Sequence, residues 1–221
     1  VILMSCVRWY KKHPLEDGAP KGGVGMIEAT VLSIYNDVIK GCIGENYRRY
    51  APYLLTAFFF VLVNNLMGLI PIFPGGANVT GNIAITLVLA LCTFVLTNVY
   101  GTKAYWKEIF WPDVPTWLKA PIPMMPLIEF FGIFTKPFAL MIRLFANIMA
   151  GHAAVLSLVA IIFITVKSGP VINGSMTVVS VAFSIFMNAL EILVAFIQAY
   201  VFTMLSAVFI GLSQVKEHAE K

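Results

Sequence analysis

Long stretches without any charged side chain are the strongest constraint on how this sequence can fold. Residues 50–102 form a run of 53 without Asp, Glu, Lys, Arg or His, and between Lys167 and Lys216 the only charge is Glu191. Both runs exceed the ~20 apolar residues that a helix needs to cross a bilayer. Only 12% of the residues are charged, about half the ~25% of a soluble domain. The sequence therefore predicts an all-α, multi-pass membrane protein.

The charge and cysteine patterns exclude several function classes. The net charge of +4 is spread over predicted loops, without the basic patch that binds nucleic acid. The three cysteines are far apart, with no Cys-x-x-Cys spacing and no clustered histidines. We therefore predict neither a disulfide framework nor a metal site, and no bound cofactor. The glycine-rich segment GAPKGGVG lacks the Gly-Lys-Ser/Thr ending of a phosphate-binding loop.

Changes in hydropathy divide the chain into four segments. Residues 1–50 are predicted to hold the end of a first transmembrane helix, whose start is missing here, and a polar loop over 8–49 with a short interfacial helix at 27–39. Residues 51–101 are predicted to form a transmembrane hairpin, from apolar runs over 53–73 and 83–100. Residues 102–126, rich in Trp, Lys and Pro, are predicted to form a cytoplasmic loop. Residues 127–221 are predicted to form two long antiparallel helices, over 127–166 and 176–215.

The last two predicted helices are too long to cross the membrane upright. Each covers about 40 residues, which at 1.5 Å per residue gives ~60 Å, twice the ~30 Å thickness of the hydrocarbon layer. We therefore expect both helices to tilt, bend or protrude. Pro137 lacks a backbone donor, which predicts a kink near that point.

The distribution of basic residues predicts the orientation of the chain. Twelve of the fifteen Lys and Arg lie within 8–49, within 103–119 and in the tail after Val215, whereas the turns over 74–81 and 167–175 hold only Lys167. Basic residues accumulate on the cytoplasmic side of a membrane. The tips of both hairpins are therefore predicted to face outward, with the C-terminus in the cytoplasm.

Five ionisable side chains fall inside the predicted long helices, where each costs about 2.5 to 3.5 kcal/mol on insertion scales and is a functional candidate. They are Glu129, Lys136, Arg143, His152 and Glu191. The first three are spaced by seven residues, so they form one stripe along their helix, and Asn147 extends this stripe.

Polar residues of the second long helix are predicted to face those of the first. Asn188, Glu191 and Gln198 share one face of that helix. Facing residues of an antiparallel pair with a short turn have nearly constant sums of residue number. Arg143 with Gln198 gives 341 and His152 with Glu191 gives 343. One register therefore aligns both polar pairs.

Two interpretations of these polar residues differ in what they predict. Ordinary interhelical hydrogen bonds and ion pairs explain Asn188 and Gln198 adequately. They do not explain Arg143, which has no Asp or Glu within one turn and whose charge Gln198 cannot neutralise. This indicates a counter-charge from another subunit. A lone His is usually a satisfied core residue, but His152 aligned with Glu191 can share a proton near neutral pH.

Three ordered motifs resemble a known family. PLIEFFGIFTKPFALMIRLFANIMAGH over 126–152 resembles the signature of subunit a of F-type ATP synthases, in which a helix carries Arg-Leu-Phe-x-Asn-x-x-Ala-Gly. NALEILVAFIQAYVFTML over 188–205 is similar to the last helix of that family, and NNLMGLIP over 64–71 to its earlier hairpin. The resemblance covers the chain from about Tyr47 to Leu212.

The resemblance implies a role for each matching residue. Arg143 matches the essential arginine that faces the rotating ring of c subunits, and Asn147 and Gln198 match the polar residues that flank it. His152 and Glu191 match two linked positions where many bacterial members have Glu first and His second, so the pair is exchanged here, as in mitochondrial-type members. Glu129 and Lys136 match a Glu and a Lys of the same helix. Gly68 stands where some relatives have an acidic residue.

The mechanism that the resemblance implies is proton translocation through two half-channels. Arginine does not deprotonate in proteins, so Arg143 acts on a neighbouring carboxyl group, whose pKa a nearby cation lowers by roughly 1 to 3 units. Protons from outside reach the ring through His152 and Glu191, and leave on a cytoplasmic path lined by Glu129. The implied partners are the c-subunit ring, the b-subunit peripheral stalk and the lipid bilayer.

Two other functions remain open from the sequence alone. One is a stand-alone secondary transporter or channel with Arg143 as an anion site, and the other is a structural scaffold in which the polar stripe is inert. The chain contains no nucleotide chemistry of its own, and either H⁺ or Na⁺ is compatible with it as the coupling ion. The loop sequences resemble bacterial ones, which favours a bacterial inner membrane over a mitochondrial one.

Overall fold

The described part of the chain is helical throughout. The computed structural model describes residues 8, 22–69, 81–110, 124–166 and 170–214. In chain order the elements are α2 (Gly23–Ser33), the π-helix η2 (Ile34–Lys40), α3 (Gly41–Ile43), the 3₁₀ turn η3 (Gly44–Asn46), α4 (Tyr47–Leu69), α5 (Ile83–Val99), α6 (Lys103–Phe110), α8 (Met124–Thr165) and α9 (Pro170–Ser213). None of these described elements is a strand, which confirms the predicted all-α class.

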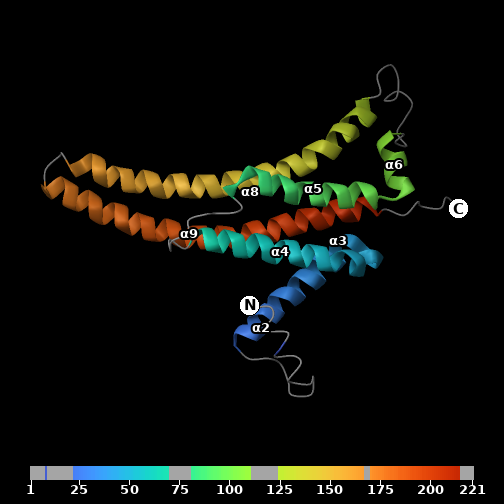
Figure 1. Cartoon of the computed structure of the whole chain (residues 1–221), viewed down its shortest axis with the longest axis horizontal. Helices are drawn as coiled ribbons and strands as arrows, with labels where there is room; N and C mark the ends of the chain where they lie inside the picture. Colours follow the sequence, from blue (N-terminus) through green and yellow to red (C-terminus); the bar gives the residue numbers. More distant parts are fainter. Residues whose placement is uncertain (1–7, 9–21, 70–80, 111–123, 167–169, 215–221) are drawn as a thin grey trace.

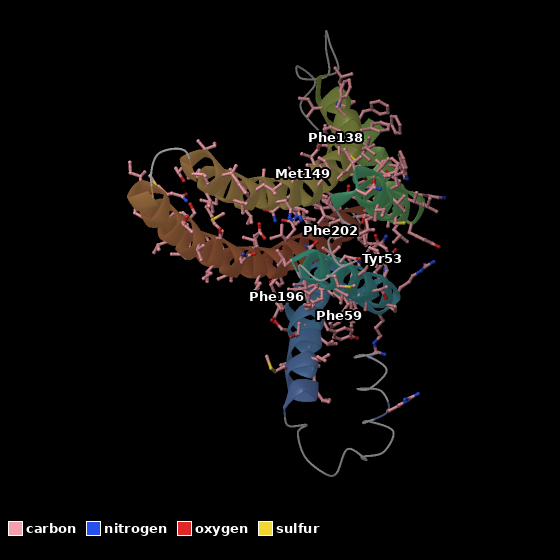
Figure 2. The ribbon with its side chains drawn as sticks, turned by 60° about the vertical axis from the view of Figure 1, so that its left-hand side comes forward. Tyr53, Phe59, Phe138, Met149, Phe196 and Phe202 are labelled. Atoms are coloured by element: carbon pink, nitrogen blue, oxygen red, sulfur yellow. The ribbon has the colours of Figure 1, made fainter. Side chains whose placement is uncertain are left out.

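Three of the described helices are long and apolar enough to cross a bilayer. They cover Tyr47–Leu69, Pro126–Thr165 and Ile172–Ser213, and the shorter α5 is also apolar. Large apolar side chains such as Phe138 and Met149 point outward from the ribbon (Figure 2) and are exposed. An apolar exterior of this kind suits contact with lipid and not with water. The protein is therefore a helical membrane protein, as predicted.

Helices α8 and α9 form the predicted antiparallel pair and run side by side along the molecule (Figure 1). They contain 42 and 44 residues, or ~60 Å each at 1.5 Å per residue. Helix α8 continues through Pro137 without a break and is curved in Figure 1. The turn between the helices is shorter than the predicted 167–175, because α9 begins at Pro170. Proline suits that first helical position, where its missing N–H would have no partner within the helix.

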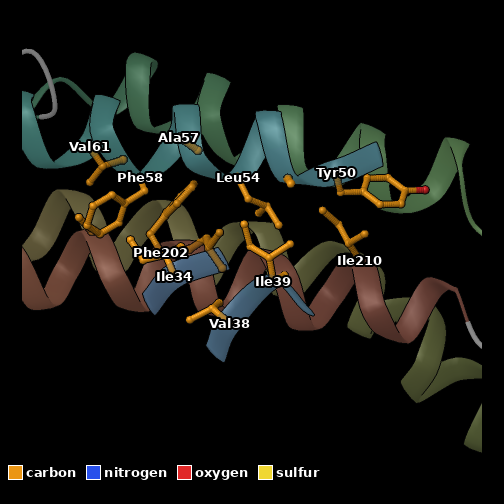
Figure 3. Close-up of a cluster of buried hydrophobic side chains, with 14 of the residues drawn as sticks. Ile34, Val38, Ile39, Tyr50, Leu54, Ala57, Phe58, Val61, Phe202 and Ile210 are labelled. Atoms are coloured by element: carbon orange, nitrogen blue, oxygen red, sulfur yellow. The ribbon is translucent and has the colours of Figure 1, made fainter. Parts of the chain in front are cut away.

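The core lies where α4 and η2 pack on the C-terminal half of α9 (Figure 3). Leu54 and Phe58 of α4, Ile39 of η2, and Phe202 and Ile210 of α9 are almost completely buried. Close to this core, α9 meets the backbone of α3, where a side chain at residue 211 would overlap the carbonyl oxygen of Cys42. A glycine at residue 211 is therefore required for the two backbones to approach this closely.

Three hydroxyl groups join α4, α5 and α9 inside the bundle. The hydroxyl groups of Tyr53 and Thr93 lie 2.8 Å apart, and those of Thr93 and Ser206 lie 3.3 Å apart. Thr93 and Ser206 are buried. Hydrogen bonds of this kind between membrane helices contribute about 0.6 to 2 kcal/mol each, so they fix how the three helices pack.

Two predicted loops are wrong where the structure describes them. The segment 8–49 is helical from Gly23 onward, because Ile34, Val38 and Ile39 gain a buried face against α4 and α9. The predicted helix over 27–39 is therefore part of a longer one. The loop over 102–126 contains α6, which buries Tyr105 and Ile109 against α8.

Both apolar runs of the predicted hairpin are helical, and the second helix matches its predicted bounds more closely than the first. α5 spans Ile83–Val99, within one residue of the predicted 83–100, and Asn82 caps it by accepting a hydrogen bond from the Ala84 N–H at 3.0 Å. α4 begins at Tyr47, six residues before the predicted start. Residues 70–80, which include most of the predicted turn over 74–81, and residues 111–123 of the predicted loop over 102–126 lie outside the described part of the chain, as do residues 1–7 of the predicted first transmembrane helix.

Candidate functional site

Arg143 lies near the middle of α8 with an exposed side chain. Its neighbours Leu140 and Leu144 are buried in the bundle, about 60° and 100° from it around the helix, so Arg143 lies at the edge of the buried face of α8. Within the described residues Arg143 has neither an ion pair nor a hydrogen bond. A cation that the helix presents outward without a counter-charge among the described residues is expensive in a membrane, which makes Arg143 a functional candidate.

Small residues surround Arg143 on the same face of α8. Ala139, Ala146 and Ala150 are four before, three after and seven after Arg143, so they lie within about 60° of it around the helix, and all three are exposed. Small side chains allow the backbone of another helix to come close. The face around Arg143 therefore suits close contact with a neighbouring helix.

A first cavity, here called the Glu191 cavity, opens between α4, α8 and α9 and measures about 40 Å³. Its lining consists of Asn65, Leu69, Asn147, Ile148, Gly151, His152, Glu191, Val194 and Ala195. The Oε1 atom of Glu191 is buried and has no hydrogen-bond partner in the described structure. A polar cavity larger than ~15 Å³ can hold water, which would satisfy this oxygen.

Residue Gly151 determines how closely Glu191 approaches α8. A Cβ atom added at Gly151 would overlap the Glu191 carboxylate. The two residue numbers add to 342, between the sums of 341 and 343 predicted for the polar pairs. The predicted register is therefore confirmed, and it brings His152 and Glu191 to the same cavity.

A second cavity, here called the Lys136 cavity, lies between α5, α6, α8 and α9 and measures about 20 Å³. Its lining consists of Thr93, Phe94, Thr97, Asn98, Tyr105, Ile133, Lys136, Pro137, Leu140 and Phe209. The Nζ atom of Lys136 lies 5.8 Å from the ring centroid of Phe209, a cation–π contact. The Oδ1 atom of Asn98 is buried without a partner in the described structure.

The two cavities lie on opposite sides of Arg143 along α8. α8 contributes residues 133–140 to the Lys136 cavity and residues 147–152 to the Glu191 cavity. Arg143 falls on the turn between them. Within the described residues, the arrangement is therefore two separate cavities along α8, with Arg143 between the residues that line them.

The other predicted site residues lie outside the two cavities. Gln198 is buried, its Nε2 atom has no partner, and it makes no hydrogen bond to Arg143 in the described structure. Asn188 is exposed and donates to the carbonyl of Ser184 at 2.9 Å. Glu129 is half-buried at the start of α8. Burial and, to a smaller extent, the Glu129 carboxylate raise the pKa of Tyr105 in α6.

Five polar residues that line the cavities are not among the predicted site residues, namely Asn65, Thr93, Thr97, Asn98 and Tyr105. They carry no charge at neutral pH and lie outside the two long helices that hold the predicted candidates. An amide inside an uncharged helix is itself an unusual residue, and that signal would have found Asn65 and Asn98.

Comparison with known proteins gives a consistent result. The family model described as ATP synthase A chain matches residues 1–211. A protein of Chlorobium phaeobacteroides named ATP synthase subunit a is 52% identical over 209 residues, which cover 91% of this chain and 57% of that protein. A protein of the same name from Pelodictyon phaeoclathratiforme is 47% identical over 227 residues, which cover 100% of this chain and 63% of that protein. Another from Myxococcus xanthus is 43% identical over 225 residues, which cover 99% of this chain and 70% of that protein. The chain thus spans about three fifths of the length of the first two relatives.

Proposed function

Because the chain belongs to the ATP synthase A chain family, we propose that it is the stationary subunit through which protons reach and leave a rotating ring of small subunits. The position of Arg143 between the Glu191 and Lys136 cavities is the observation that carries this proposal. The two cavities are the inner ends of two half-channels, and Arg143 is the group that keeps them apart.

Arg143 acts on a carboxyl group that the ring brings to it. The guanidinium stays charged at any pH of interest, and a cation within ~4 to 6 Å lowers a carboxyl pKa by roughly 1 to 3 units. A protonated ring carboxyl that arrives from lipid therefore loses its proton beside Arg143. The exposed Ala139, Ala146 and Ala150 allow the ring helix to come close enough for this contact.

The Glu191 cavity is the end of the path from outside. It lies on the side of Arg143 that leads to the predicted outer tip of the α8–α9 hairpin, and it holds two groups that carry protons, His152 and Glu191. Asn65 and Asn147 in the same lining can hold water between these groups. Each proton that crosses a membrane potential of 100 mV releases about 2.3 kcal/mol.

The Lys136 cavity is the start of the cytoplasmic path, which ends near Glu129. This side of Arg143 leads to the N-terminal end of α8 and to the basic segment around α6. The partners that follow are the ring, a peripheral stalk that prevents this subunit from rotating, and the lipid of a bacterial inner membrane. Relatives from bacteria support the choice of membrane.

Cysteine cross-linking tests whether the Arg143 face meets the ring. Ala150→Cys lies about 20° from Arg143 around the helix and Met149→Cys about 120° from it, and both positions are exposed. In a background without the native cysteines, Ala150→Cys is expected to form a disulfide with a cysteine placed on the outer ring helix, and Met149→Cys is not. Equal cross-linking by both variants, or by neither, contradicts the proposal and leaves a stand-alone transporter as the alternative.

Gly151→Ala is expected to reduce proton pumping about tenfold while the complex still assembles. The new Cβ overlaps the end of the flexible Glu191 side chain, which can swing away at little cost in stability but then leaves the cavity. ATP-driven acidification of inverted membrane vesicles measures the effect. The matched control is Gly132→Ala on the same helix, where an added Cβ meets nothing within 4 Å. A loss as large in the control variant would show that the effect is general to α8.

A further inference from the structure

Two polar groups in the Lys136 cavity have no partner within the described part of the protein. The Oδ1 atom of Asn98 is buried without a hydrogen bond, while the Nδ2 atom of the same side chain donates to the carbonyl of Phe94 at 2.8 Å. Tyr105 also lines this cavity, and its hydroxyl group makes no hydrogen bond to a described residue. The cavity therefore offers an acceptor and a donor that face no protein partner.

Water is the species that satisfies both groups. The cavity measures about 20 Å³, above the ~10 to 15 Å³ that one water molecule requires, and its lining adds the hydroxyl groups of Thr93 and Thr97 and the ammonium group of Lys136. Buried polar atoms in folded proteins are almost always paired with protein or with ordered water.

Tyr105 also packs against the first part of α8, the helix that carries Glu129. α6 lies at the end of the bundle where α5 ends and α8 begins (Figure 1), and Tyr105 packs with Ile109 against Ile133 of α8. Glu129 is four residues before Ile133, one turn earlier on the same side of α8. Burial and, to a smaller extent, the Glu129 carboxylate raise the pKa of the Tyr105 hydroxyl. Tyr105 therefore lines the cavity and packs one helical turn away from the carboxylate that the sequence predicts for the exit side.

We propose that Tyr105 relays protons between the water of the Lys136 cavity and the Glu129 carboxylate. This inference rests on the function proposed above. A proton released on the ring side enters the cavity water, and the hydroxyl oxygen accepts a proton from that water while the hydroxyl proton moves to the Glu129 carboxylate. After the step the water and Tyr105 are both neutral again, and the carboxylate has gained the proton. Asn98 holds the water by accepting a hydrogen bond from it.

Tyr105→Phe tests the relay because it removes the hydroxyl group and keeps the ring that packs against α8. Inverted vesicles are first stripped of the catalytic head, the soluble part of the complex that makes ATP, so that protons can flow passively through the membrane sector. This passive flux is expected to fall about tenfold, the effect of losing one hydrogen-bonded link. Asn98→Leu removes the acceptor, fills the cavity with apolar atoms, and is expected to lower the flux to a similar extent. The control is Trp106→Phe, a change in the neighbouring aromatic residue, which lines neither cavity, and it should leave the flux unchanged.

The outcomes separate this inference from the proposed function. Normal flux in both Tyr105→Phe and Asn98→Leu overturns the relay, even where Arg143→Ala abolishes coupling as the proposed function requires. A reduced flux in Trp106→Phe equal to that in Tyr105→Phe also overturns it, because the loss then follows from packing. Normal coupling in Arg143→Ala would contradict the proposed function itself, whatever the Tyr105 variant does.

Discussion

Arg143→Ala is expected to abolish ATP synthesis driven by the proton gradient, by at least about 100-fold, while the complex still assembles. The ring carboxyl then meets no cation and keeps its proton, because a shift of roughly 1 to 3 pKa units is lost. Assembly survives because Arg143 is exposed and makes no ion pair or hydrogen bond within the described residues. Such substitutions usually change stability by less than ~0.5 kcal/mol. ATP synthesis in energised vesicles, set against the amount of this subunit in the membrane, measures the effect.

Arg143→Lys is the informative companion variant. Lysine keeps a positive charge but presents it as a compact point, without the planar fork that binds a carboxylate through two hydrogen bonds. We expect it to retain less than about a tenth of the activity. The control is Met149→Ala, an exposed neighbour on another face of α8, which should support normal synthesis. Full activity in Arg143→Lys would show that charge alone is sufficient, and full activity in Arg143→Ala would refute the assigned role.

Glu191→Gln is expected to reduce ATP-driven proton pumping about 100-fold, the scale on which a positioned proton carrier contributes. Glutamine keeps the size of the side chain in the Glu191 cavity but does not exchange its protons with water as a carboxyl group does. Folding should be unaffected, because the buried Oε1 atom has no protein partner to lose in the described structure. Acidification of inverted vesicles on addition of ATP measures the pumping.

The matched control for Glu191 lies one turn earlier on α9. Asn188 is also polar but exposed, and it donates only to the backbone of its own helix. Asn188→Ala should therefore pump normally. If Asn188→Ala loses as much activity as Glu191→Gln, the polar face of α9 matters as a whole and Glu191 has no special role. If Glu191→Gln pumps normally, protons do not use the Glu191 cavity.

The long helices and their register follow directly from the sequence. Uncharged runs longer than the membrane is thick permit only helices, because lipid offers no partner for the backbone groups. The two sums of residue number predicted the register that brings Gly151 against Glu191. Side-chain chemistry was sufficient here because charges in the membrane occur at few positions and need neighbours.

The N-terminal segment and the Lys136 cavity did not follow from the sequence, for two physical reasons. Between residues 22 and 46 only 27–39 is predicted to be helical, because glycines interrupt the pattern on both sides, and the longer helical segment is supported by the burial of Ile34, Val38 and Ile39 against α4 and α9. Such tertiary support is invisible in a local window. The Lys136 cavity combines residues from α5, α6, α8 and α9, up to 116 positions apart, and only the folded bundle brings them together.

Passive proton leak through the Arg143→Ala membrane sector is the most direct test that Arg143 separates two half-channels. Vesicles stripped of the catalytic head are given a proton gradient without ATP, and the decay of the gradient is followed. With the cation removed, protons can pass directly between the Glu191 and Lys136 cavities. We therefore expect the proton gradient to decay faster in Arg143→Ala than in Arg143→Lys. We also expect that adding Glu191→Gln to Arg143→Ala closes the leak again. A gradient that decays at the same rate in all three variants would contradict the account, because Arg143 would then not stand between two proton paths.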